Sequence, residues 1–229
     1  MNDKICKLGN KEHRESVQIL LDYAADVIKE EENKAPYYAY MYGVICHFCL
    51  DAYCHGFVNG NVADYGIAHN LQEAEFDRYL MELDGYNPLK FKPANTLKNE
   101  DDAENVIAKV SPELTPRIVR AAIRRMRKWL NFYIAPHKIT RGIIYGAMWI
   151  TGNYKSKNGM IMKYKKQESC TEIVDELMRL YEKSLNLAYL VITDYADNVE
   201  GGLPYRKAVT YNFSPQRSIE RDLDNGILR

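Results

Sequence analysis

Helical periodicity dominates the pattern of apolar and polar residues in this chain. Over residues 12–32, apolar positions recur every three or four residues, which places them on one face of an amphipathic helix. A second helix is expected over 36–57, with Pro36 in its first turn, and a third over 69–83, which stops before Gly85. The apolar face of the first helix comprises Val17, Leu20, Leu21, Ala24, Val27 and Ile28.

The second half of the chain continues this pattern after a loop. Residues 85–99 contain Gly85, Pro88 and Pro93, and they are therefore expected to be non-helical. A short helix near 100–109 should follow, and then a long helix over about 115–133, because Thr115 followed by proline suits a helix start. Pro136 ends this helix, and another is expected near 140–150.

A capping box at 169–172, with the sequence SCTE, marks the start of the last long helix, which should run to about residue 197. Residues 205–213 are expected to form either a short strand or an extended loop. No Pro-, Ser- or Gly-rich linker divides the chain, so we predict a single all-α domain, a helical bundle, over residues 1–229. The apolar stripe of the last helix comprises Ile173, Leu177, Leu180, Ser184, Leu187 and Val191.

Composition narrows the class of protein. Apolar residues make up 46% and charged residues 27% of the 229, which favours a folded core over intrinsic disorder. The net charge is zero, which argues against a dedicated nucleic-acid binder. The longest apolar stretch, 37–52, is shorter than the ~20 residues of a membrane span, and the polar N-terminus has no signal-peptide core. We therefore expect a cytoplasmic protein.

The most informative segment is rich in histidine. His47, Asp51 and His55 are spaced four residues apart, and His69 and Glu73 repeat this spacing on the next expected helix. Residues four apart differ by only ~40° in azimuth, so each set projects from one helix face. Helical bundles build metal sites in this way, and imidazole with carboxylate suits zinc, iron or manganese. The two oxygens of Asp51 allow it to bridge two metal ions.

A simpler interpretation competes with the metal site. Histidines on apolar helix faces are often ordinary core residues, and an acid four residues away pairs with them. However, burying so many ionisable groups without a metal would cost several kcal/mol. A helical di-iron carboxylate protein is a further alternative, but the Glu-x-x-His pairs typical of that class are absent from the sequence.

These motifs resemble those of the bacterial zinc-dependent phospholipase C family, in particular its intracellular members from anaerobic Gram-positive bacteria. The family's motif consists of H-x3-D, a further His and H-x3-E, and this chain has the same elements at similar spacing. The segments YGVICHFCLDAYCH and IAHNLQEAEFDRYLMELDG also resemble those of the family. Residues 8–13, LGNKEH, are similar to the turn that supplies another zinc-binding histidine, His13. The resemblance is strong over 8–90 and weaker over 110–213.

The resemblance implies an all-α bundle around a multinuclear zinc site. His13, His47 and Asp51 would hold one zinc ion, and His55, His69 and Glu73 a second. The implied activity is hydrolysis of a phospholipid or another small phosphodiester, with Asp51 as the central catalytic residue. Asp77, one turn beyond Glu73, is expected to orient a ligand.

The family's third zinc site and its general base depend on residues upstream of this motif. Residues 1–7 contain no histidine, and Asp3 is not in a matching context. We therefore expect an N-terminally shortened member with two zinc ions. The alternative is a non-catalytic family remnant whose zinc is structural.

Two further features have ordinary explanations. The chain has five cysteines, an odd number that argues against a disulfide framework, and Cys46, Cys49 and Cys54 are expected to be small core residues. Residues 111–141 hold eight Lys and Arg against one acid, Glu113. This segment, through 117–128, is expected to contact either an anionic membrane or only solvent.

Overall fold

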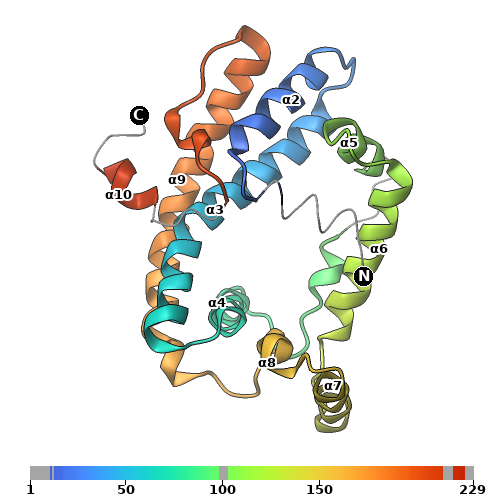
Figure 1. Ribbon diagram of the computed structural model, residues 1–229, viewed down its shortest axis with the longest axis vertical. Coiled ribbons are helices and arrows are strands. Elements are labelled where there is room, and N and C mark those ends of the chain that lie inside the picture. Colours follow the sequence, from blue (N-terminus) through green and yellow to red (C-terminus); the bar gives the residue numbers. More distant parts are fainter. Residues whose placement is uncertain (1–10, 12, 98–102, 214–218, 225–229) are drawn as a thin grey trace. The chain divides into compact units, whose positions relative to one another are not determined.

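The computed structural model describes residues 11, 13–97, 103–213 and 219–224 (Figure 1). Among these residues there is no strand, so the all-α prediction is confirmed. The α-helices are α2 (Val17–Lys29), α3 (Ala35–Tyr65), α4 (His69–Leu83), α5 (Ala103–Val110), α6 (Pro116–Phe132), α7 (Lys138–Ile150), α8 (Tyr154–Lys157), α9 (Thr171–Gly201) and α10 (Ile219–Asp224). Short 3₁₀ helices are η1 (Pro93–Asn95), η2 (Asn158–Met160), η3 (Glu168–Cys170) and η4 (Lys207–Thr210).

Two helix boundaries differ from the sequence-based expectation by five residues or more. The helix α2 begins at Val17 rather than near residue 12, because the Ser16 hydroxyl accepts a hydrogen bond from the Gln18 N–H at 3.2 Å and caps the helix there. The helix α3 does not end at residue 57 but continues to Tyr65. It stops at Gly66, whose φ of 68° is the left-handed conformation that commonly ends a helix.

The expectation for residues 205–213 is tested by the structure, whereas the N-terminal motif is not. Within 205–213, the structure has η4 instead of a strand. The LGN segment at 8–10, the glutamate at position 12 and residues 1–7 all lie outside the described residues.

The chain forms two compact units. The first comprises Met1–Phe57, Asn99–Ala122 and Arg179–Arg229, and the second comprises Val58–Lys98 and Ile123–Met178. Three helices, α3, α6 and α9, contribute residues to both units. The sequence-based interpretation of one domain over 1–229 stays a prediction.

The first unit buries the middle of α3 and most of the apolar stripe of α2, of which Leu20 and Val27 are only half-buried. Val17, Leu21 and Ile28 of α2 are buried, as their spacing indicates, and so are Ile45 and Phe48 of α3. The helices α3 and α9 are joined by Tyr38, whose hydroxyl donates to Glu200 Oε1 at 2.9 Å and whose ring packs edge-on against the buried Tyr195. The stripe predicted for α9 is buried throughout.

The second unit contains an apolar cluster and, separately, a group of buried polar and charged side chains. Ala135, Ile144, Met148 and Ile161 form an apolar cluster between α7 and its flanking segments. The buried side chains of α4 include Gln72, which makes hydrogen bonds, and Glu75 and Arg78, which form an ion pair. None of the helices in the described part of the chain is long and apolar enough to cross a bilayer.

Candidate metal centre

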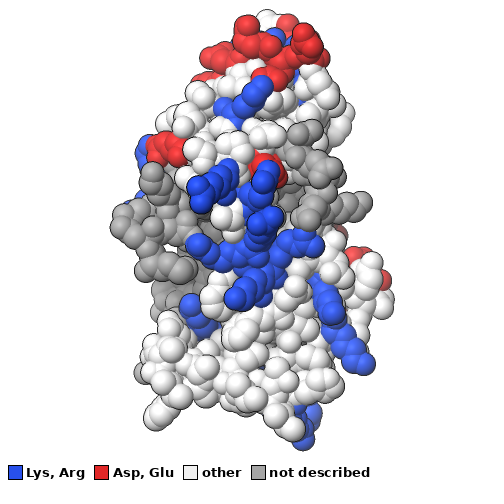
Figure 2. Space-filling model, turned by 90° about the vertical axis from the view of Figure 1, so that its right-hand side faces the viewer, with Lys and Arg blue, Asp and Glu red and all other residues white. Residues whose placement is uncertain are grey.

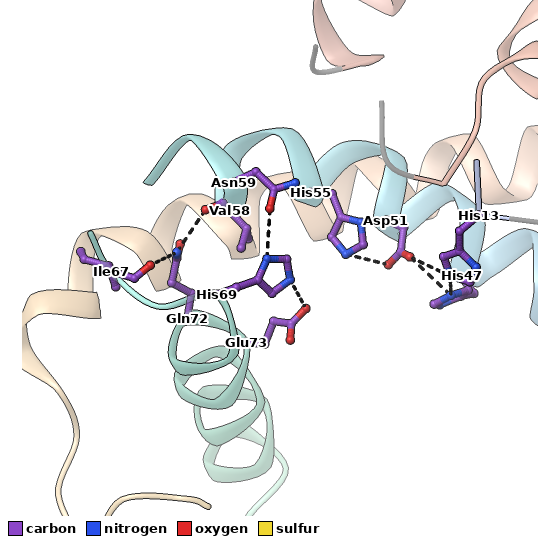
Figure 3. A network of polar contacts seen from close by, with 10 residues as sticks. All are labelled: His13, His47, Asp51, His55, Val58, Asn59, Ile67, His69, Gln72 and Glu73. Atoms are coloured by element: carbon purple, nitrogen blue, oxygen red, sulfur yellow. Dashed lines mark hydrogen bonds and ion pairs between the residues drawn. The ribbon is translucent and has the colours of Figure 1, made fainter. Parts of the chain in front are cut away.

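The first candidate ligand set lies along one face of α3. His47 Nε2 is 3.4 Å from Asp51 Oδ2, while His55 Nε2 is 3.8 Å from the other oxygen, Oδ1 (Figure 3). The four-residue spacing on a continuous helix produces this column, as the sequence predicted. Asp51 therefore presents each of its oxygens to a different imidazole, which is the arrangement that a bridging carboxylate requires.

His13, from the turn before α2, completes this set. Its Nε2 is 3.4 Å from His47 Nε2 and 4.0 Å from Asp51 Oδ2, and the ligand atoms of the three residues all lie within 4.8 Å of one another. Ligands placed tetrahedrally around zinc at about 2.1 Å are separated from each other by about 3.4 Å. The nitrogen and oxygen atoms of His13, His47 and Asp51 thus lie close enough together to form a three-ligand site for a metal ion.

The segment around η4 fixes the turn that carries His13. The Ser16 hydroxyl donates to the Val209 carbonyl at 2.8 Å, and the Val17 N–H donates to the Tyr211 carbonyl at 3.0 Å. The buried ring of Phe213 then stacks on His13 with centroids 4.6 Å apart and lies 5.4 Å from His47. Phe213 was not predicted, because no motif around it signals this role.

The protonation state of His47 suits a ligand. Burial lowers the pKa of its imidazole, and although Asp51 opposes this effect, the neighbouring His13 and His55 add to it. The neutral imidazole, which can donate a lone pair to a metal, is therefore favoured at neutral pH. The site is nevertheless open, because the side chains of His13 and His47 are 43% and 54% exposed, against 13% for Asp51.

In the second unit, His69 and Glu73 lie together on α4. His69 Nε2 is 2.9 Å from Glu73 Oε1, and His69 Nδ1 is 3.1 Å from Asn59 Oδ1 of α3 (Figure 3). With its proton on Nδ1, His69 donates to Asn59 and directs the Nε2 lone pair toward Glu73. A cation or a second proton between Nε2 and the carboxylate satisfies both groups.

The buried Gln72 holds the corner between α3 and α4. Its Nε2 donates to the carbonyls of Val58 at 3.1 Å and Ile67 at 3.0 Å, and its Oε1 accepts from Asn61 Nδ2 at 3.0 Å. The side-chain amide thus makes three hydrogen bonds in a fully buried position. This network fixes the start of α4, where His69 is the first residue.

A cavity of about 240 Å³ in the second unit reaches one of the candidate ligands. Glu73 and Asp77 lie in its wall, together with Tyr133, Met81 and Phe91. Desolvation by this wall, assisted by the charge of Glu73, raises the pKa of Asp77 to about 6, although the residue as a whole is exposed. Asp77 continues the His69–Glu73 face by one turn, as the sequence indicates.

The predicted set His55, His69 and Glu73 draws on both units. His55 belongs to the first unit with Asp51, whereas His69 and Glu73 belong to the second.

The cysteines of α3 are not part of the ligand sets. Cys49 and Cys54 are buried, and burial raises the pKa of both thiols, that of Cys54 to about 12 with the help of the Asp51 charge. Both are therefore neutral core residues, as expected. The same expectation was wrong for Cys46, which is exposed because its position on α3 faces away from the core.

Comparisons of the chain with protein-family models, with curated proteins and with solved structures found no match. Membership of the zinc-dependent phospholipase C family therefore rests on the sequence motifs alone and stays a prediction.

Proposed function

We propose that this chain is a zinc-dependent phosphodiester hydrolase of the phospholipase C type. The observation that carries the proposal is the placement of Asp51, with Oδ2 facing His13 and His47 and Oδ1 facing His55. His13, His47 and Asp51 would hold one zinc ion, and His55, His69 and Glu73 a second. Zinc, when bound, supplies a water of lowered pKa, toward ~7, and charge that stabilises phosphoryl oxygens.

The residues of the chain then have distinct roles. The Asp51 carboxylate would take part in holding the metal, since its Oδ2 faces His13 and His47 and its Oδ1 faces His55. Phe213 holds the rings of His13 and His47, and Asn59 holds the His69 ring with Nε2 toward Glu73. These contacts orient the lone pairs before any ligand binds, which reduces the reorganisation that a charged transition state would otherwise require.

The exposure of the ligands favours catalysis over a structural role. Structural zinc sites are closed by four protein ligands, whereas catalytic sites keep an open position. His13 and His47 are about half exposed, and among the described residues each candidate set comprises three ligand residues. This openness supports an enzyme rather than a remnant with structural zinc.

The cavity beside Glu73 suggests where a substrate would bind. At about 240 Å³ it has room for a small group and not for a whole phospholipid. Its wall combines the carboxylates of Glu73 and Asp77 with apolar and aromatic side chains, among them Met81, Phe91 and Tyr133. A substrate with a compact headgroup on a phosphodiester fits these features best.

The proposal is tested by zinc content and by hydrolysis of p-nitrophenylphosphocholine. We expect about two zinc ions per chain after purification without chelator, and activity that is lost on chelation and restored by zinc. Asp51→Asn should abolish activity, because a neutral amide is a poor bridge between two cations. The matched control is Asp64→Asn, the same change at an exposed position of α3 outside the ligand sets.

Three results would contradict the proposal. Absence of zinc with no uptake on addition would remove the metal site, and activity that survives both chelator and Asp51→Asn would belong to another site or a contaminant. Two bound zinc ions without hydrolysis of any phosphodiester would instead support the structural remnant.

A further inference from the structure

The helix α7 carries apolar side chains on two opposite faces. Ile144 and Met148 point into the apolar cluster of the second unit. At about 100° per residue, Ile139, Ile143 and Ile150 lie within ~40° of one another on the opposite side. These three side chains are 80%, 68% and 80% exposed, and Trp149 beside them is 76% exposed. A helix in contact with water on one side normally carries polar residues there.

The outer face of α7 is open along its length. A Cβ atom added at Gly142 or Gly146, which lie between the isoleucines on this side, would meet no atom within 4 Å. The last turns of α6 also carry exposed apolar side chains, those of Met126, Trp129 and Phe132. We call Met126, Trp129, Phe132, Ile139, Ile143, Trp149 and Ile150 together the α6–α7 surface.

Positive charge accompanies this surface. Between residues 114 and 167 the chain carries thirteen Lys and Arg and no Asp or Glu, although its overall net charge is zero. Figure 2 shows Lys and Arg side chains gathered on one side of the molecule. In the second unit, Arg124, Arg125 and Lys128 of α6 are exposed, and the ammonium of Lys157 lies 6.0 Å from the Trp129 ring.

We propose that the α6–α7 surface docks on an anionic lipid bilayer, with the α7 isoleucines in the acyl region and the α6 cations at the headgroups. The apolar face with a basic flank is the pattern of helices that lie in a membrane interface. Both tryptophans of the chain are on this surface, and tryptophan favours the interface between headgroups and acyl chains. With 13 residues, α7 lies on the bilayer and does not span it.

The charge decides between the possible occupants of the surface. A second copy of the chain would bring a like-charged flank against the first and would be repelled. A nucleic acid would be complementary in charge to the cations but would leave the three isoleucines and Trp149 without a function. An anionic bilayer is complementary both to the cations of α6 and to the apolar side chains of α7. This inference does not depend on the proposed hydrolysis, because it concerns neither metal ligand set.

Vesicle flotation and tryptophan fluorescence test the proposal with the full chain. The probes are vesicles of phosphatidylcholine with or without phosphatidylserine. We expect binding to the anionic vesicles at low salt, weaker binding at high salt, and a blue shift of the emission, which comes only from Trp129 and Trp149. Pure phosphatidylcholine should bind more weakly.

Two double variants separate the apolar and the charged parts. Ile143→Asn with Ile150→Asn should weaken partitioning at least about tenfold. Arg124→Glu with Lys128→Glu should do the same for anionic vesicles. The matched controls should leave binding unchanged. They are Leu83→Asn, an exposed apolar residue of α4, and Lys90→Glu with Lys92→Glu, an equal charge change in the same unit.

Three results would overturn the proposal. The first is no binding to anionic vesicles at low ionic strength. The second is binding that depends on the cations but not on the two isoleucines, since this is the behaviour of a general polyanion surface. The third is a dimer in solution that Ile143→Asn with Ile150→Asn splits, which would make α7 a self-association interface.

Discussion

The ring of Phe213 stacks on the imidazole of His13 with their centroids 4.6 Å apart and their planes inclined by 29°. The two residues come from opposite ends of the chain, and the same phenylalanine also lies edge-on to the buried Phe48 of α3. Phe213 therefore connects the turn that carries His13 to the helix that carries His47 and Asp51. Its flat, buried ring restricts the directions in which the two histidine lone pairs can point.

Phe213→Leu is predicted to weaken zinc binding while leaving the fold intact. Leucine keeps the apolar contact but lacks the flat face that orients His13, and loss of such a supporting contact typically costs 10–100-fold in metal affinity, about 1.4–2.8 kcal/mol. Competition with a zinc chelator measures the affinity, and thermal unfolding of the metal-free protein checks the fold. Phe132→Leu, at an exposed position of α6, is the matched control. Unchanged affinity in Phe213→Leu would mean that the ring only fills space.

The candidate ligands were predictable where their geometry is local. His47, Asp51 and His55 lie on one helix, so their spacing of four fixed the column on α3, and the same holds for His69 and Glu73 on α4. Phe213 could not be predicted, because its contact depends on the return of the chain after α9 rather than on any local pattern. Asn59 was missed for a related reason, since α3 was expected to end at residue 57, two residues before it.

Gly66 shows which signal could have corrected that boundary. A glycine followed by the start of another periodic segment is a common helix stop, although the Asn59–Gly60 dipeptide is a turn signal that competes with it in the sequence. Gly66→Ala is predicted to destabilise the protein by about 1 kcal/mol, because alanine is strained at a φ of 68°. Gly60→Ala is the control within α3, where no atom lies within 4 Å of the added Cβ, and it should be neutral or stabilising. Urea unfolding of both variants provides the comparison.

Asn59 is predicted to act on the metal site through His69. Asn59→Leu removes the Oδ1 acceptor 3.1 Å from His69 Nδ1, so the imidazole is free to rotate and to change tautomer. Zinc content should fall, and the stabilisation of the fold by zinc, seen as the difference in melting temperature with and without chelator, should shrink with it. Asn59→Asp, which keeps the acceptor, should retain both. Full zinc content in Asn59→Leu would show that Glu73 alone orients the ring.

The stability of the first unit is predicted to depend on pH through Glu220. Hydrogen bonds from Arg179 and from Lys183 lower the pKa of Glu220 to about 2, and burial opposes them. The folded state holds this proton less tightly than the unfolded chain, whose glutamate pKa is about 4.3. The contribution to stability is therefore complete above pH ~4.3 and is lost as the pH falls toward 2. Glu220→Gln should lower the free energy of unfolding at pH 7 by about 1 kcal/mol and have no effect near pH 2.

Glu113→Gln serves as the control for this pH dependence. Glu113 pairs with Lys11 at 3.4 Å, but both side chains are more than half exposed. Its loss should change the free energy of unfolding by less than about 0.5 kcal/mol at either pH. If Glu220→Gln has the same effect at pH 7 and at pH 2, its contribution is steric rather than electrostatic.

The buried ion pair between Glu75 and Arg78 is predicted to dominate the mutational sensitivity of α4. Glu75 Oε2 is 3.3 Å from Arg78 Nε and accepts a hydrogen bond from the Gln167 N–H at 3.0 Å, and Arg78 also donates to the Lys163 carbonyl. Both side chains are almost fully buried. Glu75→Ala leaves the guanidinium charge in a low-dielectric environment and should cost about 3–5 kcal/mol, measured by chemical unfolding.

Replacing both partners of this pair should cost much less than the two single changes together. Glu75→Met with Arg78→Met removes both charges and fills a similar volume with flexible apolar side chains, a change that is often neutral in buried pairs. The backbone N–H of Gln167 and the carbonyl of Lys163 then lose their side-chain partners, which limits the recovery to part of the cost, since each lost hydrogen bond is worth about 1 kcal/mol. We expect a coupling free energy of at least about 1.5 kcal/mol in a double-mutant cycle at pH 7. Additive effects of the single variants would show that Glu75 stabilises the second unit through Gln167 alone. The charge of Arg78 would then be compensated by Glu82, whose Oε1 lies 3.7 Å from Arg78 Nη1.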